Sequence, residues 1–190
     1  MANALTTLRL ILAAPFSFLM VSDDPGHVIL AALTLAVGIA TDLLDGLVAR
    51  RRGTASPGGR AFDHAADFVF VVSGLAAGAA RGAFPWILPL LVAAAFAQYV
   101  VDSYWVDRRS TLRPSRLGRY NGILYFVPLA GDILVRAGLT LVRPLLTAVV
   151  WMLVVSTVVS MGERFLGSWR RREELACRAT EKEQTDRRIP

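Results

Sequence analysis

Cysteine is almost absent from this chain of 190 residues: Cys177 is the only one, and it lies in a polar C-terminal segment. An internal disulfide is therefore excluded, and nothing points to an oxidising compartment. Lysine is equally scarce, because 20 of the 21 basic residues are arginine. The sequence also lacks the marks of a cleaved signal peptide, which are a basic start before the first apolar run and a small-residue cleavage site after it.

Amphipathic spacing is missing as well. The chain is 54% hydrophobic with a mean hydropathy of +0.48, and its apolar residues come in long runs. Such runs are typical of membrane helices, so we expect an all-α integral membrane protein with six transmembrane helices. A transmembrane domain over residues 1–162 and a charged tail over residues 163–190 are expected. The six expected spans are residues 5–21, 28–50, 60–80, 84–106, 119–136 and 141–161.

The net charge of +6 has an uneven distribution. With six spans, 18 of the 21 basic residues fall on the side of the termini. This asymmetry predicts cytoplasmic N- and C-termini by the positive-inside rule. It leaves Arg81, Arg136 and Arg143 on the other side. Because the basic residues sit in short connections between apolar runs, we expect anionic lipid or phosphate as their partners and no nucleic acid.

Four aspartates stand at the cytoplasmic ends of the second and third expected spans. Asp42 and Asp45 are three residues apart, and Asp63 and Asp67 are four apart. On a helix each pair shares one face, with Cβ atoms about 5–6 Å apart. The connection between the pairs is short and rich in glycine, which predicts an antiparallel hairpin. The two carboxylate pairs should then face each other across it.

Carboxylates this close repel one another unless cations neutralise them. Oxygen ligands suit Mg²⁺ or Mn²⁺, and two such ions can clamp both sides of a phosphoryl displacement. Gly46 would let a ligand approach the backbone, and Arg50 could pair with phosphate. The plainer alternative is that each aspartate forms a salt bridge with a neighbouring arginine. Two helical pairs at membrane depth favour a functional site.

The pattern from Asp42 to Asp67 reads D-x2-D-G-x2-A-R-x8-G-x3-D-x3-D. It resembles the signature of the CDP-alcohol phosphotransferases and fixes eight residues over 26 positions. The resemblance implies a membrane enzyme of phospholipid synthesis that displaces CMP from a CDP-linked donor, usually CDP-diacylglycerol. It implies residues 1–162 as the catalytic domain, in the cytoplasmic (inner) cell membrane, with the active site facing the cytoplasm. Members of this family are often homodimers, so the resemblance also implies a homodimer.

The resemblance also implies a role for each residue of the signature. The metal ligands would be Asp42, Asp45, Asp63 and Asp67. Asp67 would in addition be the general base for the acceptor hydroxyl. The nucleotide and diphosphate pocket would be shaped by Gly46, Ala49, Arg50 and Gly59.

The acceptor alcohol is less clearly indicated. The start N-A-L-T-T-L-R, residues 3–9, resembles that of bacterial phosphatidylglycerophosphate synthases, which favours glycerol 3-phosphate. The fifth span begins R-L-G-R-Y-N-G and departs from the G-K-x-K-T-like sequence usual there. Inositol phosphate, serine and phosphatidylglycerol remain alternatives. A basic loop that could bind an acceptor phosphate, or merely set the topology, contains Arg108, Arg109, Arg113, Arg116 and Arg119.

Some features allow other interpretations. Buried aspartates would also suit a small cation-coupled transporter, although a transport site more often lies at the bilayer midplane. Gly74 and Gly78 form a G-x-x-x-G motif that could pack helices within the chain or between two copies. Asp132 and Arg136 are one turn apart, so we expect them to pair locally.

Overall fold

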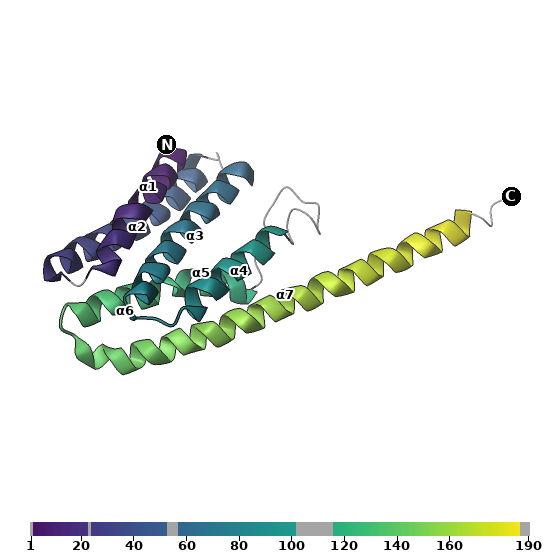
Figure 1. Cartoon of the computed structure of the whole chain (residues 1–190). Coiled ribbons are helices and arrows are strands. Elements are labelled where there is room, and N and C mark those ends of the chain that lie inside the picture. The colour runs from purple at the N-terminus through teal and green to yellow at the C-terminus, as the bar shows by residue number, and fades with distance from the viewer. Residues whose placement is uncertain (1, 23, 53–56, 102–115, 187–190) are drawn as a thin grey trace.

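The structure is a computed structural model whose backbone is described for residues 2–22, 24–52, 57–101 and 116–186. Over these residues the chain is helical and contains no strand. Side chains are described for residues 4–22, 24–44, 59, 62–101, 117–118, 120–167 and 169. The elements (Figure 1) are α1 (Ala2–Val21), α2 (Pro25–Arg52), α3 (Pro57–Ala80), α4 (Ile87–Val101), α5 (Arg116–Leu124), α6 (Phe126–Arg136), the 3-10 turn η2 (Thr140–Val142) and α7 (Arg143–Asp186).

Helix α1 packs against both α2 and α3, most extensively against α3. Phe16 of α1 stacks on Phe70 of α3 with ring centroids 4.6 Å apart, and both rings are fully buried. Gly74 permits this approach, because a Cβ there would lie 2.5 Å from the ring of Phe16. Gly78 faces the ring of Phe84 in the same way. The G-x-x-x-G motif therefore serves packing within the chain.

The turn between α1 and α2 is closed by Asp24. Its carboxylate accepts a hydrogen bond of 2.7 Å from the backbone N–H of Gly26, and its carbonyl accepts one from the N–H of His27. Pro25 occupies the first helical position, where a missing N–H costs nothing. Asp24 is thus an N-cap that satisfies a free donor at the start of α2.

The fifth expected span is two helices in line rather than one. Helix α5 ends at Leu124 and α6 begins at Phe126, with Tyr125 between them. Pro128 lies in the first turn of α6 and has no N–H to donate to the carbonyl of Leu124, which explains the interruption. The Tyr125 hydroxyl lies 2.7 Å from the hydroxyl of Thr157, so the break is tied to α7.

Helices α3 and α6 end in the same way. Gly82 and Gly138 both adopt positive φ, at 86° and 102°. In each case the next residue donates its N–H back across the last turn, from Ala83 to the carbonyl of Gly78 and from Leu139 to the carbonyl of Leu134. This is the Schellman ending, which favours glycine at the left-handed position. It turns the chain sharply at the end of the bundle where α1 also ends (Figure 1).

Within the described part of the chain, four helical stretches are long and apolar enough to cross a membrane: 4–21, 25–44, 62–80 and 140–167. Large apolar side chains also point outward, including Ile29 at 67% exposure and Leu141 at 93%. Such outward faces need a lipid environment. The protein is therefore a membrane protein. Helix α4 is apolar but short, and α5 with α6 covers the fifth expected span, so the six-span topology with cytoplasmic termini stays a prediction.

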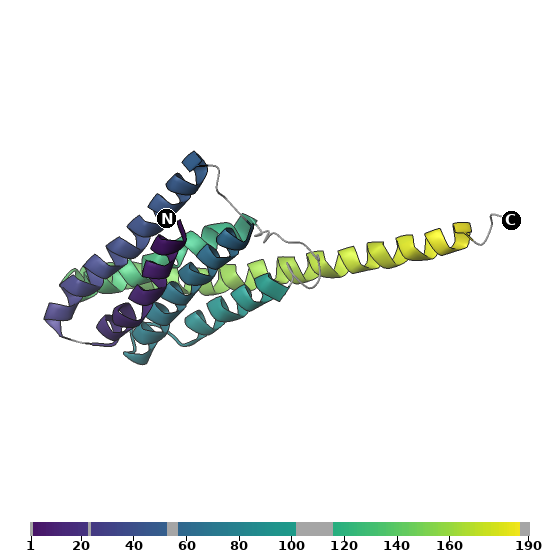
Figure 2. The ribbon, with the colours of Figure 1, turned by 90° about the horizontal axis from the view of Figure 1, so that it is seen from above.

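Helix α7 runs without interruption from Arg143 to Asp186. It therefore crosses the boundary at residue 162 that we expected between a catalytic domain and a tail, and that division stays a prediction. Figures 1 and 2 show the C-terminal part of α7 extending well beyond the other helices. Residues 163–186 of the expected charged tail belong to α7.

Candidate active site

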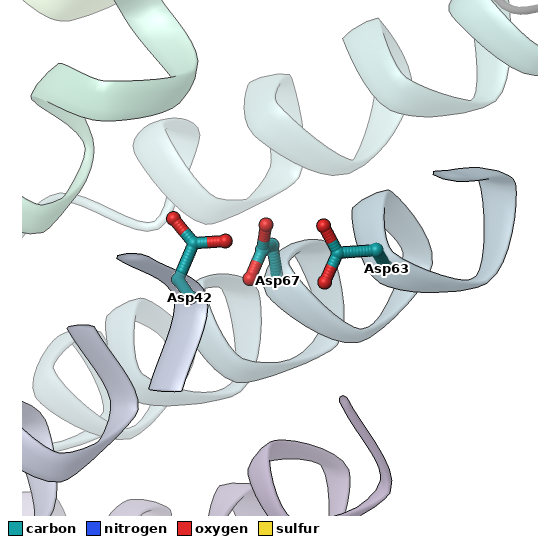
Figure 3. A group of neighbouring side chains, drawn as sticks. All are labelled: Asp42, Asp63 and Asp67. Carbon is teal, nitrogen blue, oxygen red and sulfur yellow. The ribbon is translucent and has the colours of Figure 1, made fainter. Parts of the chain in front are cut away.

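Three of the four predicted aspartates meet at one place. Asp42 projects from α2, and Asp63 and Asp67 project from neighbouring turns of α3 (Figure 3). One carboxylate oxygen from each lies within 4.8 Å of the others. The side chains are 41%, 28% and 25% exposed, in that order, so the cluster is accessible from outside the bundle. The expected facing of the two carboxylate pairs holds for these three. Asp45 belongs to α2, but its side chain lies outside the described residues.

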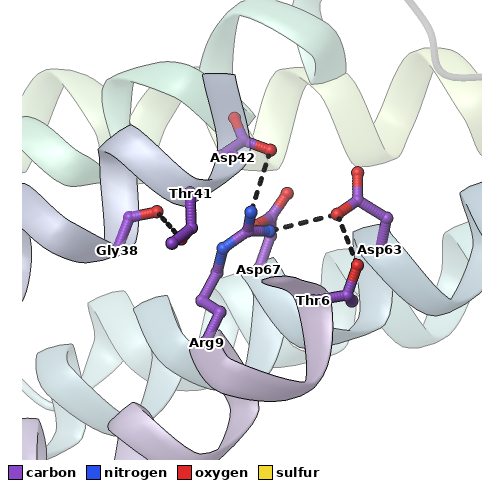
Figure 4. A network of polar contacts seen from close by, with 7 residues as sticks. All are labelled: Thr6, Arg9, Gly38, Thr41, Asp42, Asp63 and Asp67. Carbon is purple, nitrogen blue, oxygen red and sulfur yellow. Dashed lines mark hydrogen bonds and ion pairs between the residues drawn. The ribbon is translucent and has the colours of Figure 1, made fainter. Parts of the chain in front are cut away.

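Arg9 of α1 lies inside this cluster (Figure 4). Its side chain is fully buried, and its Nη1 donates to a carboxylate oxygen of Asp67 and, at 3.2 Å, to Asp63. Its Nη2 lies 3.5 Å from a carboxylate oxygen of Asp42. The hydroxyl of Thr6, one turn before Arg9, donates to Asp63 at 3.5 Å. Helix α1 thus joins the two helices that carry the aspartates.

The packing around the cluster explains why α1 can deliver a guanidinium there. Thr6 and Arg9 share one face of α1, and both are buried against α2 and α3. On α2, Thr41 is also buried, and its hydroxyl donates to the carbonyl of Gly38 within the same helix. Gly38 allows close approach of α3, because a Cβ there would lie 2.9 Å from the ring of Phe70. The aspartate cluster therefore lies next to a tightly packed contact between α1, α2 and α3.

Sequence reasoning missed Arg9 as a site residue and placed it within the first expected span, residues 5–21. The signal was present in two forms. An ionisable residue at membrane depth is a functional candidate, whether acidic or basic. In addition, Thr6 and Arg9 belong to the N-terminal stretch of residues 3–9, which we used only to choose an acceptor. Their spacing of three residues places them on one helical face, as it does for the aspartates.

The charges of the cluster do not cancel. One guanidinium faces three carboxylates, which leaves two negative charges when all are ionised. Nε and Nη2 of Arg9 are buried without a hydrogen-bond partner. Such donors are rare inside proteins, so the guanidinium is the least satisfied group of the cluster. The excess negative charge suits a divalent cation.

The donor set fits the metal that the sequence predicts. Mg²⁺ and Mn²⁺ prefer carboxylate oxygens, and octahedral coordination by Mg²⁺ places ligand oxygens about 3–4 Å apart. The three oxygens, within 4.8 Å of one another, would need to close only slightly. The aspartate cluster can therefore hold a divalent metal ion.

The other predicted site residues are only partly placed. Gly46, Ala49 and Arg50 lie in the last turns of α2, at the same end as the cluster, but their side chains lie outside the described residues. Gly59 lies in the first turn of α3. In the basic loop, Arg108, Arg109 and Arg113 fall outside the described residues. Arg116 and Arg119 begin α5, with side chains that are likewise not described.

A family model for CDP-alcohol phosphatidyltransferases matches residues 1–162, so this chain belongs to the CDP-alcohol phosphatidyltransferase family. The protein is therefore a transferase of membrane phospholipid synthesis, and the family resemblance of its aspartate signature is confirmed.

The chain is also similar to two proteins of Mycobacterium tuberculosis, one from strain CDC 1551 / Oshkosh and one from strain ATCC 25618 / H37Rv. Each is named probable phosphatidylglycerophosphate synthase. The identity is 28% over 160 residues, which cover 79% of this chain and 77% of each relative.

Proposed function

We propose that this protein transfers the phosphatidyl group of CDP-diacylglycerol to glycerol 3-phosphate and releases CMP. The observation that carries the proposal is the aspartate cluster, where Asp42, Asp63 and Asp67 converge at one end of a bundle of membrane helices. Lipid tails can stay among the helices while the diphosphate reaches the carboxylates. The family assigns phosphatidyl transfer, and the acceptor is our addition.

The reaction is a displacement at the lipid-bearing phosphorus. The acceptor oxygen forms a bond to this phosphorus, the bond to the CMP oxygen breaks, and CMP leaves. Asp67 is proposed to accept the hydroxyl proton, because the family resemblance assigns it as the general base and its carboxylate is 25% exposed. Bound Mg²⁺ or Mn²⁺, with two ions expected on Asp42, Asp45, Asp63 and Asp67, would supply neutralisation of the diphosphate charge.

Arg9 has a positioning role in this proposal. It contacts Asp63 and Asp67 from one guanidinium nitrogen and Asp42 from another, so it sets the distance between α2 and α3 at the site. Because a planar guanidinium offers donors in a rigid fork, it holds the carboxylates in one orientation. The donor pocket would be completed by Gly46, Ala49, Arg50 and Gly59.

Glycerol 3-phosphate is favoured by the name of the two mycobacterial relatives and by the N-terminal stretch of residues 3–9. A phosphate-bearing acceptor also gives a purpose to the basic loop, whose residues we propose as acceptor ligands: Arg108, Arg109, Arg113, Arg116 and Arg119. The sequence at the start of α5 departs from the G-K-x-K-T-like sequence usual in phosphatidylglycerophosphate synthases. Inositol phosphate, serine and phosphatidylglycerol therefore remain alternative acceptors for the same chemistry.

We further propose that the enzyme lies in the cytoplasmic membrane with six spans, with both termini and the active site on the cytoplasmic side. The distribution of basic residues supports this orientation. With six spans, 18 of the 21 basic residues fall on the same side of the membrane as the aspartates. A homodimer is part of the proposal on family grounds.

The test is an assay of CMP release from CDP-diacylglycerol in mixed micelles. Purified full-length protein would be incubated with Mg²⁺ or Mn²⁺ and, separately, glycerol 3-phosphate, inositol phosphate, serine and phosphatidylglycerol. We expect metal-dependent CMP release with glycerol 3-phosphate. CMP release with one of the other compounds but not with glycerol 3-phosphate would identify that compound as the acceptor instead. No CMP release with any acceptor would contradict the transferase mechanism.

A matched pair of variants separates the site from general effects of charge. Asp63→Asn should abolish release, because it removes one of the clustered carboxylates. Asp24→Asn makes the same change at the opposite end of α1, where asparagine caps a helix as well as aspartate does. It should leave the rate unchanged. Equal losses in the two variants would argue against the aspartate cluster as the active site.

A further inference from the structure

A second charged site lies at the other end of the bundle from the aspartates. Arg9 and Met20 lie about 16 Å apart along α1, at a rise of 1.5 Å per residue. Beyond Met20, where α3 and α6 end and α7 begins, there is a cavity of about 390 Å³. Its polar lining includes Arg81, Arg136, Arg143 and Asp132. The aspartate cluster contributes nothing to this cavity.

The cavity gathers the three arginines that the charge distribution left off the basic side of the protein. Arg81 follows α3, whereas Arg136 ends α6 and Arg143 begins α7, so two connections bring the three arginines together. Among the described lining residues, three guanidinium groups and one carboxylate leave an excess of two positive charges. Basic residues are disfavoured on the non-cytoplasmic side, so their convergence calls for a binding role beyond topology.

Two of these arginines, Arg81 and Arg136, are held in place by other groups of the protein. We expected Asp132 to pair with Arg136, but the structure pairs it with Arg81, since the turn after α3 brings Arg81 over α6. Nε of Arg81 also donates to the carbonyl of Met20 at 3.0 Å. Nη2 of Arg136 donates to the carbonyl of Leu19 at 3.2 Å. Guanidinium groups that are already held in place lose little freedom when they bind an anion.

Arg143 differs, because it is exposed on the first turn of α7. Thr147 lies one turn later, and both residues line the cavity. The N–H of Arg143 is bonded to the carbonyl of Thr140, and the dipole of α7 favours an anion at this position. Combined with the three arginines, this end of α7 suits a phosphate group.

An apolar groove adjoins the charged cavity. Trp151 lines both, and from there the groove follows α7 past Met152 and Val155 to Val159. These four side chains are between 47% and 61% exposed. A phosphate site that continues into an apolar groove on a membrane-facing helix matches one ligand, a phospholipid. A free phosphate would not use the groove.

We propose that this cavity binds the phosphate of an anionic phospholipid through Arg81, Arg136 and Arg143, with an acyl chain along the groove below Trp151. The site faces the leaflet opposite the aspartates, so it is separate from the proposed transfer reaction. The bound lipid would hold α3, α6 and α7 together at the end of the bundle where α3 and α6 end and α7 begins.

Quenching of tryptophan fluorescence by brominated lipids tests the proposal. Full-length protein in a neutral detergent would be titrated with phosphatidylglycerol and with phosphatidylcholine that carry the same dibrominated chains. Trp151→Phe isolates the signal of the groove from the other tryptophans. We expect phosphatidylglycerol to quench Trp151 at a mole fraction about tenfold lower than phosphatidylcholine, because charge-assisted hydrogen bonds to arginine favour the anionic lipid.

The decisive comparison is between two arginine variants on α7. Arg143→Gln should raise the half-quenching fraction of phosphatidylglycerol about tenfold, since it loses one charged contact. Arg164→Gln has the same charge change about 31 Å further along the helix and should match the wild type. If Arg143 proves necessary for folding, the Trp151→Phe comparison between the two lipids decides by itself. Equal quenching by both lipids, equal behaviour of the two arginine variants, or full displacement by millimolar inorganic phosphate would overturn the proposal.

Discussion

Replacing Arg9 with methionine should destabilise the protein when divalent metal is removed, and adding metal should reverse much of the loss. Methionine keeps the length of the side chain and favours helix, so the main change is the loss of charge inside the aspartate cluster. In the wild type, Arg9 is fully buried among Asp42, Asp63 and Asp67. Without it, three carboxylates face one another with no built-in countercharge.

The size of the effect follows from the geometry. Two unit charges no more than 4.8 Å apart repel by about 3.5 kcal/mol or more at an effective dielectric constant of about 20. Asp42 is 41% exposed, so water screens its share, and the pair Asp63 and Asp67 dominates. Removing one partner of a buried ion pair typically costs about 3–5 kcal/mol. For a chain of this size that lowers the melting temperature by about 10 °C.

The assay is thermal unfolding of purified protein in detergent, once with a chelator and once with Mg²⁺. Metal at a hundred times its dissociation constant stabilises a protein by about 2.7 kcal/mol. The gain should be larger in Arg9→Met than in the wild type, because Arg9 no longer offsets the negative charge. Arg164→Met serves as the control, since it removes one positive charge at a place where the guanidinium lies 4.6 Å from the centre of the Tyr99 ring.

Two results would refute this reasoning. One is a melting temperature of Arg9→Met in chelator that equals that of the wild type, which would mean that Arg9 does not neutralise the cluster. The other is an equal shift on adding Mg²⁺ to both proteins, which would mean that Arg9 and the metal do not act on the same carboxylates.

The remaining predictions concern the base, the basic loop and helix packing. Asp67→Asn should abolish turnover while CDP-diacylglycerol still binds, as followed by equilibrium binding; a near-normal rate would exclude Asp67 as the base. Arg109→Ala and Arg116→Ala should each raise the Michaelis constant for glycerol 3-phosphate, and unchanged kinetics would leave the loop a purely topological role. Gly74→Ala should lower the melting temperature, because its Cβ would lie 2.5 Å from a buried phenylalanine ring of α1 and overpacking costs about 1–3 kcal/mol. Gly122→Ala, a helical glycine with nothing within 4 Å, should be neutral or slightly stabilising, and equal effects at both glycines would contradict the packing explanation.

Much of the site could be predicted from the chain because the signals are local. The spacing of Asp63 and Asp67 places them on one face of any helix, and the apolar runs require helices whatever their neighbours are. The segment from Asp42 to Asp67 also carries the family signature, which the family match confirms. The proposed donor half of the reaction, from the metal ligands to the leaving CMP, therefore rests on one short stretch of sequence.

The tertiary structure decided which distant groups meet. Arg9 of α1 and Asp67 of α3 are separated in the chain by the whole of α2, and their contact depends on how α1 packs against α2 and α3. Asp132 pairs with Arg81 rather than with Arg136 because a turn after α3 carries Arg81 across the bundle. Helical periodicity cannot predict either contact, since it relates only residues within one helix.

The sequence by itself determined that this protein is helical, lies in a membrane and carries a carboxylate cluster typical of its family, because each of these follows from composition or from spacing within a helix. The structure decided that a buried arginine pairs with all three carboxylates of the cluster, and that three arginines from two connections line one cavity at the far end. Both depend on packing between helices, where the close approach at glycines such as Gly74 sets which faces meet.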